Sequence, residues 1–178
     1  MTIETLALQG RDTLHPGLAG IDTARLKAIR NASLRACFNR LEDTRYRLEF
    51  VARILGREYV NDAASRTINA TWYSLESTEG GIIWIACGSD SEADYSRLVP
   101  LALRKVRMLL ILGDDSRLRK TFSGIIPTVQ SCDTMAQALH HAYMYEAVDV
   151  KVLFSPACDD GVTTEAWGEA FRREVNEL

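Results

Sequence analysis

The chain has 178 residues and a net charge of -3, and 47% of its residues are apolar while 25% are charged. This composition is typical of a globular protein with its own core and excludes a low-complexity chain, and the charge gives no reason to expect nucleic-acid binding. The chain shows no basic segment followed by a long apolar run, and its apolar runs are far shorter than the roughly 20 residues that span a bilayer, so we expect a cytoplasmic protein without membrane contact.

The first half of the chain alternates between helix and strand patterns. Apolar residues at three- and four-residue spacings predict an amphipathic helix over 24–41. Residues 48–60 alternate around a glycine and predict two strands joined by a tight turn. Residues 64–77 suit a helix, and the glycine-bounded apolar run 81–88 predicts a buried parallel strand.

The second half continues this alternation. The patterns predict a helix over 94–105, a strand over 105–115, a short helix over 116–124, a helix over 134–147 capped by Asp133 or Thr134, a strand over 148–157 and a helix over 163–178. Strands that alternate with helices of these lengths predict a Rossmann-like α/β fold, with a mostly parallel sheet covered by helices on both faces.

Four widely spaced cysteines stand at Cys37, Cys87, Cys132 and Cys158. None belongs to a C-x-x-C pair or lies at zinc-ligand spacing from a histidine, so we expect no metal site. At least three of them lie in or beside apolar runs. That placement predicts free thiols that pack as small hydrophobes.

Residues 59–76, YVNDAASRTINATWYSLE, resemble a signature of the Mur ligase family, and of its D-glutamate-adding MurD branch in particular. The family pattern reads roughly I-N-D-S-K-A-T-N-x-x-A-T-x-x-A-L. Five positions match it: Asn61, Asp62, Ala70, Thr71 and Leu75. The lysine of the pattern is Ala64 in this chain, so the framework is recognisable while its chemical side chains are replaced.

Four further segments match family motifs in the expected order, and the resemblance extends over nearly the whole chain. They are LALQGRD at 6–12, YRLEFV at 46–51, WIACGSDSEADYSRL at 84–98 and LFSPACDD at 153–160. The resemblance implies that residues 1–46 are a helical remnant of the end of a Mur central domain. It implies that residues 47–178 form a Rossmann-like domain similar to the Mur C-terminal domain.

The family uses ATP and Mg, which its central domain holds with a P-loop, G-x-x-x-x-G-K-[ST]. This chain contains no such motif. The resemblance therefore implies a chain without the family's N-terminal and ATPase domains, and we expect no cofactor and no catalytic residue.

Family position suggests five candidate ligand-binding residues: Arg47, Asp62, Arg66, Ser91 and Asp160. Arg47 matches a hinge arginine that contacts nucleotide phosphate, and Ser91 replaces a second lysine. The loops that would hold a dicarboxylic amino acid lose both lysines and gain acidic residues, among them Glu92 and Asp159. Because like charges repel, such a site would disfavour D-glutamate.

The residues themselves leave simpler interpretations open. Arg47 suits a surface ion pair as well as a phosphate contact, and Asp62 suits a cap on a helix that begins near Ala63. The pairs 114–115 and 159–160 follow predicted strands, where they could hold a divalent cation or form a solvated turn.

The resemblance favours a stand-alone, degenerate MurD-like C-terminal domain that serves as a non-catalytic binding or regulatory module in bacterial peptidoglycan precursor synthesis. The alternative is one half, or a fragment, of an ATP-dependent UDP-N-acetylmuramoyl-L-alanine:D-glutamate ligase. The apolar residues of the 24–41 helix and the hinge indicate a protein partner or self-association, because a large exposed apolar patch is a liability.

Overall fold

The computed structural model describes residues 45–178 apart from 89–92, 114–115 and 148. The chain divides into two compact units, Met1–Asp43 and Thr44–Leu178. The helix expected over 24–41 and the motif at 6–12 lie outside the described residues, so these expectations and the predicted domain boundary stay predictions.

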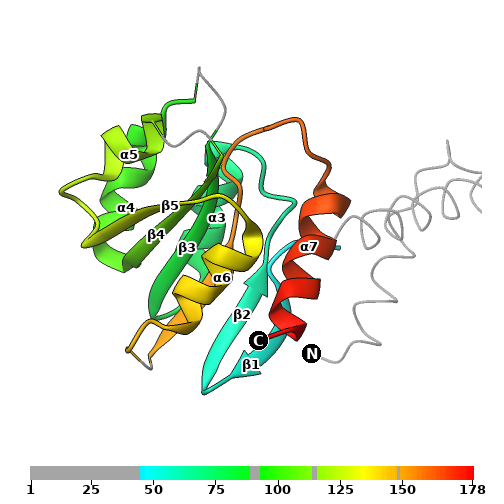
Figure 1. The fold of residues 1–178 in the computed structure, drawn as a ribbon. Helices are drawn as coiled ribbons and strands as arrows, with labels where there is room; N and C mark the ends of the chain where they lie inside the picture. The colour runs from blue at the N-terminus through cyan, green and yellow to red at the C-terminus, as the bar shows by residue number, and fades with distance from the viewer. Residues whose placement is uncertain (1–44, 89–92, 114–115, 148) are drawn as a thin grey trace, which may run out of the picture. The chain divides into compact units, whose positions relative to one another are not determined.

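The centre of the second unit is a six-stranded sheet with the strand order β1-β2-β6-β3-β4-β5 (Figure 1). The strands are β1 (Glu49–Ile54), β2 (Arg57–Asn61), β3 (Gly81–Gly88), β4 (Val106–Gly113), β5 (Thr128–Cys132) and β6 (Val150–Phe154). β1 and β2 are antiparallel, and the other neighbouring strands are parallel. The predicted Rossmann-like, mostly parallel sheet is confirmed.

Helices cover both faces of this sheet (Figure 1). They are α3 (Ile68–Ser77), the 3-10 helix η2 (Tyr95–Leu98), α4 (Val99–Lys105), α5 (Ser116–Phe122), α6 (Met135–Tyr143) and α7 (Thr164–Asn176). The side chains of β3 alternate between two apolar clusters, because successive residues of a strand point to opposite faces. Trp84 packs with the residues of α3, η2, α4 and α5, whereas Ile83 and Ile85 pack with those of α6 and α7.

The tight turn predicted between the first two strands is present. Leu55 and Gly56 connect β1 to β2 and have positive φ angles of 50° and 80°. A two-residue turn of this hand matches the twist of an antiparallel pair and requires φ above zero at both positions. The glycine meets this requirement without strain, since it has no Cβ.

Helix α3 begins at Ile68, later than the helix over 64–77 that the sequence pattern predicts. A turn over 62–65, closed by the hydrogen bond from Ser65 N to the carbonyl of Asp62 at 2.9 Å, comes first. The cap of α3 is Thr67, whose hydroxyl accepts from the backbone N–H of Ala70 at 3.2 Å. The interpretation of Asp62 as a helix cap is therefore wrong.

Two other details separate expectation from structure. The cap of α6 is Thr134, one of the two candidates, and it accepts from Gln137 N. Strand β5 was not predicted, because its sequence TVQSC has little apolar character and it lies at the edge of the sheet.

Cys87, Cys132 and Cys158 are buried free thiols, as predicted. Within the part of the chain that the structure describes, no helix is both long enough and apolar enough to cross a bilayer.

Candidate functional site

The carboxyl ends of β2, β3 and β6 meet at one edge of the sheet, where open α/β sheets bind ligands. Asp62 N donates to the carbonyl of Phe154 at 2.8 Å, which joins the ends of β2 and β6. Cys87 N donates to the carbonyl of Pro156 at 3.0 Å, which joins the ends of β3 and β6. The loops that follow β2 and β6 therefore lie side by side.

A buried cluster of hydroxyl groups lies beneath these loops. Ser155 Oγ and Thr71 Oγ1 are 2.9 Å apart, and Ser65 Oγ and Ser74 Oγ are 3.2 Å apart. All four residues are at most 2% exposed. Ser155 is thus held in a structural pair with a threonine. Both hydroxyls are fully buried, so neither is open to a substrate.

Asp62 is fully buried beside this cluster. Its Oδ1 accepts from the backbone N–H of Leu48 at 3.1 Å, and its Oδ2 has no hydrogen-bond partner among the described residues. Burial raises the pKa of this carboxyl, although the neighbouring hydroxyl groups and the N–H of Leu48, which favour its charged form, oppose the shift. Asp62 fixes the segment before β1 to the end of β2 and has no open face toward a ligand.

Arg66 closes the site above this cluster. Its guanidinium donates to the carboxylate of Asp159 and to the carbonyl of Val162, and its Nη2 lies 3.8 Å from Asp160 Oδ1. We call Arg66 together with residues 159–162 the Arg66 clamp. The hydrogen bond from Arg66, followed by one from the N–H of Gly161, lowers the pKa of Asp159.

The second aspartate of the clamp is held from three sides. Asp160 Oδ2 accepts from the indole N–H of Trp167 at 2.8 Å, and Oδ1 accepts from the N–H of Val162 at 3.1 Å. Burial first, and then the nearby charge of Asp160, raises the pKa of the Cys87 thiol well above its usual range. Asp159 and Asp160 thus act as the carboxylate partners of the Arg66 guanidinium, so the chain itself supplies the anions of the clamp.

The segment that leads into β1 is anchored to α7. The Tyr46 hydroxyl donates to Glu169 Oε1 at 2.5 Å, and the guanidinium of Arg172 lies 5.0 Å from the centre of the Tyr46 ring. Tyr46 and Leu48 have positive φ angles of 60° and 46°, which non-glycine residues rarely adopt. Arg47 stands exposed between these two anchored residues.

The structure does not bring the five candidate residues together at one place. It brings Arg66 and Asp160 together in the clamp, and it buries Asp62 in the neighbouring hydroxyl cluster. Arg47 is exposed, and Ser91 lies outside the described residues. Trp167 and Cys87 also belong to the site: Cys87 lies inside the motif segment 84–98, and Trp167 follows the segment 153–160 in a region where the family pattern has a phenylalanine. Among the described residues, no group of three His, Cys, Asp or Glu side chains could hold a metal ion.

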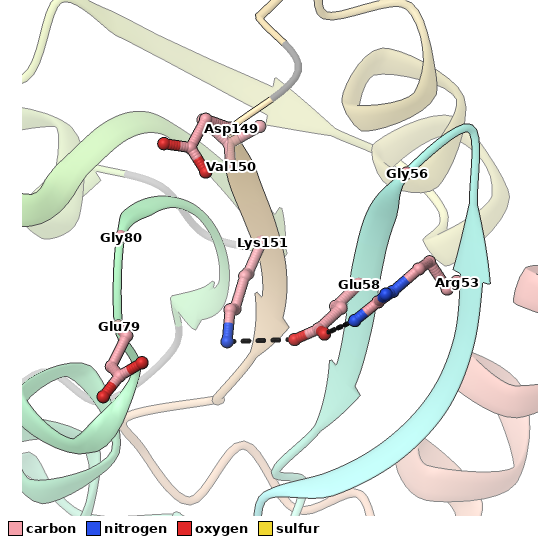
Figure 2. Close-up of a pocket in the computed structure, with 8 residues that line it drawn as sticks. All are labelled: Arg53, Gly56, Glu58, Glu79, Gly80, Asp149, Val150 and Lys151. Carbon is pink, nitrogen blue, oxygen red and sulfur yellow. Dashed lines mark hydrogen bonds and ion pairs between the residues drawn. The ribbon is translucent and has the colours of Figure 1, made fainter.

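A separate polar hollow of about 230 Å³ lies at the opposite, amino-terminal ends of β2, β3 and β6 (Figure 2). Glu58 in its wall pairs with Lys151 at 2.9 Å and with Arg53. Lys151 and Arg53 therefore already have a carboxylate partner. This arrangement fits an ion-pair cluster that holds the hairpin to β6.

Curated ligases are similar to the chain along its full length. The UDP-N-acetylmuramoylalanine–D-glutamate ligase of Porphyromonas gingivalis is 36% identical over 182 aligned positions, which cover 100% of the chain and 40% of the ligase. The ligase of the same name from Salinibacter ruber is 35% identical, with the same coverage. The chain thus spans 40% of the length of these two relatives. No family model matches it.

Solved structures agree in fold. A domain from a Haemophilus ducreyi protein titled as a UDP-N-acetylmuramate:L-alanyl-gamma-D-glutamyl-diaminopimelate ligase has a TM-score of 0.51 at 8% identity, covering 71% of this chain and 98% of that one. By sequence, the chain is similar over its whole length to part of a Mur ligase. Folylpolyglutamate synthase from Thermotoga maritima has a TM-score of 0.52 at 10% identity, covering 75% of this chain and 31% of that one.

Described residues of four motif segments lie at this sheet edge, those of 46–51, 59–76, 84–98 and 153–160, and several of their chemical positions are changed. Cys87 stands at the first glycine of the family's G-G pattern and is 1% exposed. Asp160 stands at the serine after S-P-A-C-A, and Ala64 stands at the lysine. Arg66, at the threonine position, is the cation that the structure describes there, and it is engaged by Asp159.

Proposed function

We propose that the chain is a non-catalytic binding or regulatory module of the Mur family, cytoplasmic and connected to peptidoglycan precursor synthesis. The Arg66 clamp is the observation that supports this proposal. A site for an acidic amino acid needs cations with free hydrogen-bond donors, because an ionised ligand loses its hydration on binding. Arg66 instead donates to Asp159 and Val162 of its own chain.

The charges of the clamp argue in the same direction. One arginine faces Asp159 and Asp160, so the three side chains carry a net charge of about -1 when all are ionised. A dicarboxylate would have to displace both aspartates from Arg66 and then remain close to them. Like charges at such distances disfavour binding, so we expect the site at the Arg66 clamp to reject D-glutamate.

The alternative is that the chain forms part of a longer or split ligase. Its alignment along its whole length with 40% of each D-glutamate ligase favours this alternative. The D-glutamate ligase activity in the names of those relatives would then require a nucleotide-binding partner. A partner could also bind through the apolar side of the 24–41 segment and the hinge, either as another protein or as a second copy.

Thermal unfolding with millimolar D-glutamate tests the proposed function. We expect no shift in Tm for the wild type, whereas a ligand at 100 times its Kd stabilises a protein by about 2.7 kcal/mol. The triple variant Ala64→Lys, Ser91→Lys and Asp160→Ser restores three family side chains and serves as the matched comparison. A saturable shift in the wild type would contradict the proposal.

Ligation assays separate the two candidate functions. The chain is incubated with ATP, D-glutamate and UDP-N-acetylmuramoyl-L-alanine, first alone and then with the amino-terminal 60% of a relative. We expect no product above a blank in either mixture. Product in the second mixture alone would favour the split ligase, and product in the first would contradict the non-catalytic proposal.

A further inference from the structure

A second hollow lies between α3 and η2 and shares no residue with the Arg66 clamp. It has a volume of about 540 Å³ and is lined by Ile68, Asn69, Trp72 and Arg97. Small-molecule sites commonly have volumes of about 300–1,000 Å³. The size of the hollow therefore suits one small ligand.

The polar groups of this hollow make no hydrogen bond to a described residue, although the charge of Arg97 helps to lower the pKa of the nearby Asp94. The structure gives no hydrogen bond or ion pair between any described residue and the side-chain amide of Asn69, the indole N–H of Trp72 or the guanidinium of Arg97. The nearby Asp94 carboxylate accepts from the N–H of Ser96 at 3.1 Å and from its hydroxyl at 2.6 Å. Three side chains with free N–H donors therefore line one hollow.

The surrounding charges differ from those of the hollow. One turn beyond Trp72 on α3, Glu76 pairs with Arg104 of α4 at 3.1 Å. That acid and that base are matched, whereas Arg97 is the one charged residue among the described residues that line the hollow. The guanidinium of Arg97 therefore attracts anions at this hollow, although the Asp94 carboxylate lies near enough to feel its charge.

The apolar part of the wall includes the planar indole ring of Trp72. Trp72 is 45% exposed, although tryptophan is highly buried on average. An exposed indole offers a stacking face to a planar ring, and Ile68 adds an aliphatic contact. The guanidinium prefers carboxylate or phosphate oxygens, which it can bind with two parallel hydrogen bonds.

We propose that this hollow binds a small molecule with a flat aromatic ring and an anionic group, the chemistry of a nucleotide. The ring stacks on Trp72, the anion pairs with Arg97, and the Asn69 amide bonds to a heteroatom at the ring edge. This site is independent of the proposed function, because none of its lining residues belongs to the Arg66 clamp.

Titration of the full-length chain with adenosine 5′-monophosphate, followed by NMR, tests the proposal. The chain has three tryptophans, so three indole N–H signals report on separate places. We expect the signal of Trp72 to shift saturably, while those of Trp84 and Trp167 stay in place. Adenosine lacks the anion and should bind at least about tenfold more weakly, the equivalent of one lost charged hydrogen bond. Ribose 5-phosphate lacks the ring and should also bind at least about tenfold more weakly, because it cannot stack on Trp72.

Single substitutions give matched controls on α3 and on the neighbouring helices η2 and α4. Arg97→Gln and Trp72→Leu should each weaken binding by about tenfold or more; for Trp72→Leu the remaining backbone signals near Asn69 report it. Arg104→Gln removes a paired arginine and Tyr73→Leu removes an exposed aromatic, both outside the hollow, so both should bind as the wild type does.

Three outcomes would overturn the proposal. The first is the absence of a saturable shift of Trp72 at millimolar nucleotide. The second is equal binding of adenosine and its monophosphate, which would remove the role of Arg97. The third is binding that survives Arg97→Gln or is lost equally in Arg104→Gln, since either result would place the ligand elsewhere.

Discussion

The guanidinium of Arg66 holds the carboxylate of Asp159, which stands 93 positions further along the chain. The two residues meet because their loops follow β2 and β6, which are neighbours in the sheet. This ion pair places a carboxylate of the chain itself on a cation of the candidate site. It also makes the conformation of residues 159–162 sensitive to the charge of one side chain.

Asp159→Asn should loosen the Arg66 clamp, because a neutral amide accepts a weaker hydrogen bond from the guanidinium than a carboxylate does. We expect faster amide hydrogen exchange at Gly161 and Val162 with little change in global stability, since the Asp159 side chain is exposed. Asp133→Asn, at an exposed aspartate elsewhere, is the control.

The wild type should show the same loosening on acidification. The pKa of Asp159 is lowered in the folded state, so the stabilising contribution of the pair is present above the unfolded-state pKa. This contribution is lost as pH falls through the folded-state pKa. Unchanged exchange in Asp159→Asn would show that other contacts hold the loop.

Substitutions of Asp62 should separate its charge from its hydrogen bond. Asp62→Asn keeps an acceptor for Leu48 N–H and removes the buried charge, so at neutral pH we expect stability equal to or above that of the wild type. Asp62→Ala leaves the N–H without its partner and should lower the free energy of unfolding by about 1–3 kcal/mol. Urea unfolding of the three proteins measures both effects.

The same carboxyl predicts a pH dependence of defined sign. Burial raises the pKa of Asp62 in the folded state, so its contribution to stability is fully present below the unfolded-state pKa. This contribution is lost as pH rises through the folded-state pKa. Asp62→Asn should lack that loss, and an identical dependence of stability on pH in the variant and the wild type would show that Asp62 is not its source.

Gly168→Ala should destabilise the domain although alanine favours helices. A Cβ at Gly168 would overlap the ring of Tyr46, which is buried against α7. We expect a loss of about 1–3 kcal/mol from overpacking, larger than the helix-propensity gain of about 1 kcal/mol. In a double-mutant cycle measured by urea unfolding, Tyr46→Ala should remove most of the cost of the alanine. Additive effects of the two substitutions would mean that the ring is not the obstacle.

Arg57 should be a strong stabilising residue. It is 6% exposed, and its guanidinium donates to four carbonyls at and beyond the end of α6, those of Ala142, Tyr143, Tyr145 and Ala147. Arg57→Met would remove the donor from the carbonyls of Tyr143, Tyr145 and Ala147, whereas that of Ala142 keeps a backbone N–H, and we expect a loss of about 3 kcal/mol in urea unfolding.

Two comparisons sharpen that measurement. Arg57→Lys supplies an ammonium without the planar fork and should fall between wild type and Arg57→Met. Arg53→Met, on the same hairpin, removes an exposed ion pair with Glu58 and should cost no more than about 1 kcal/mol. Similar losses at both arginines would show that burial of the guanidinium adds nothing.

Periodicity and turn chemistry predicted most of the sheet. The apolar run 81–88 and the glycine at position 56 are local signals, and β3 and the β1–β2 turn follow them. The edge strand β5 escaped prediction because only contacts with β4 make its polar sequence extended. The assignment of Asp62 to a helix cap failed for a similar reason, since its partner Leu48 comes from the segment that precedes β1.

The sequence by itself determined the fold class, the family motifs and the loss of the family lysine at Ala64. These properties depend on local hydrophobic pattern and on residue identity at known positions. Only the tertiary structure decided that Arg66 is engaged by Asp159, that Tyr46 packs on Gly168, and that Arg57 joins the hairpin to α6. Such pairs are set by strand order and crossover connections, which bring together residues that no local pattern relates.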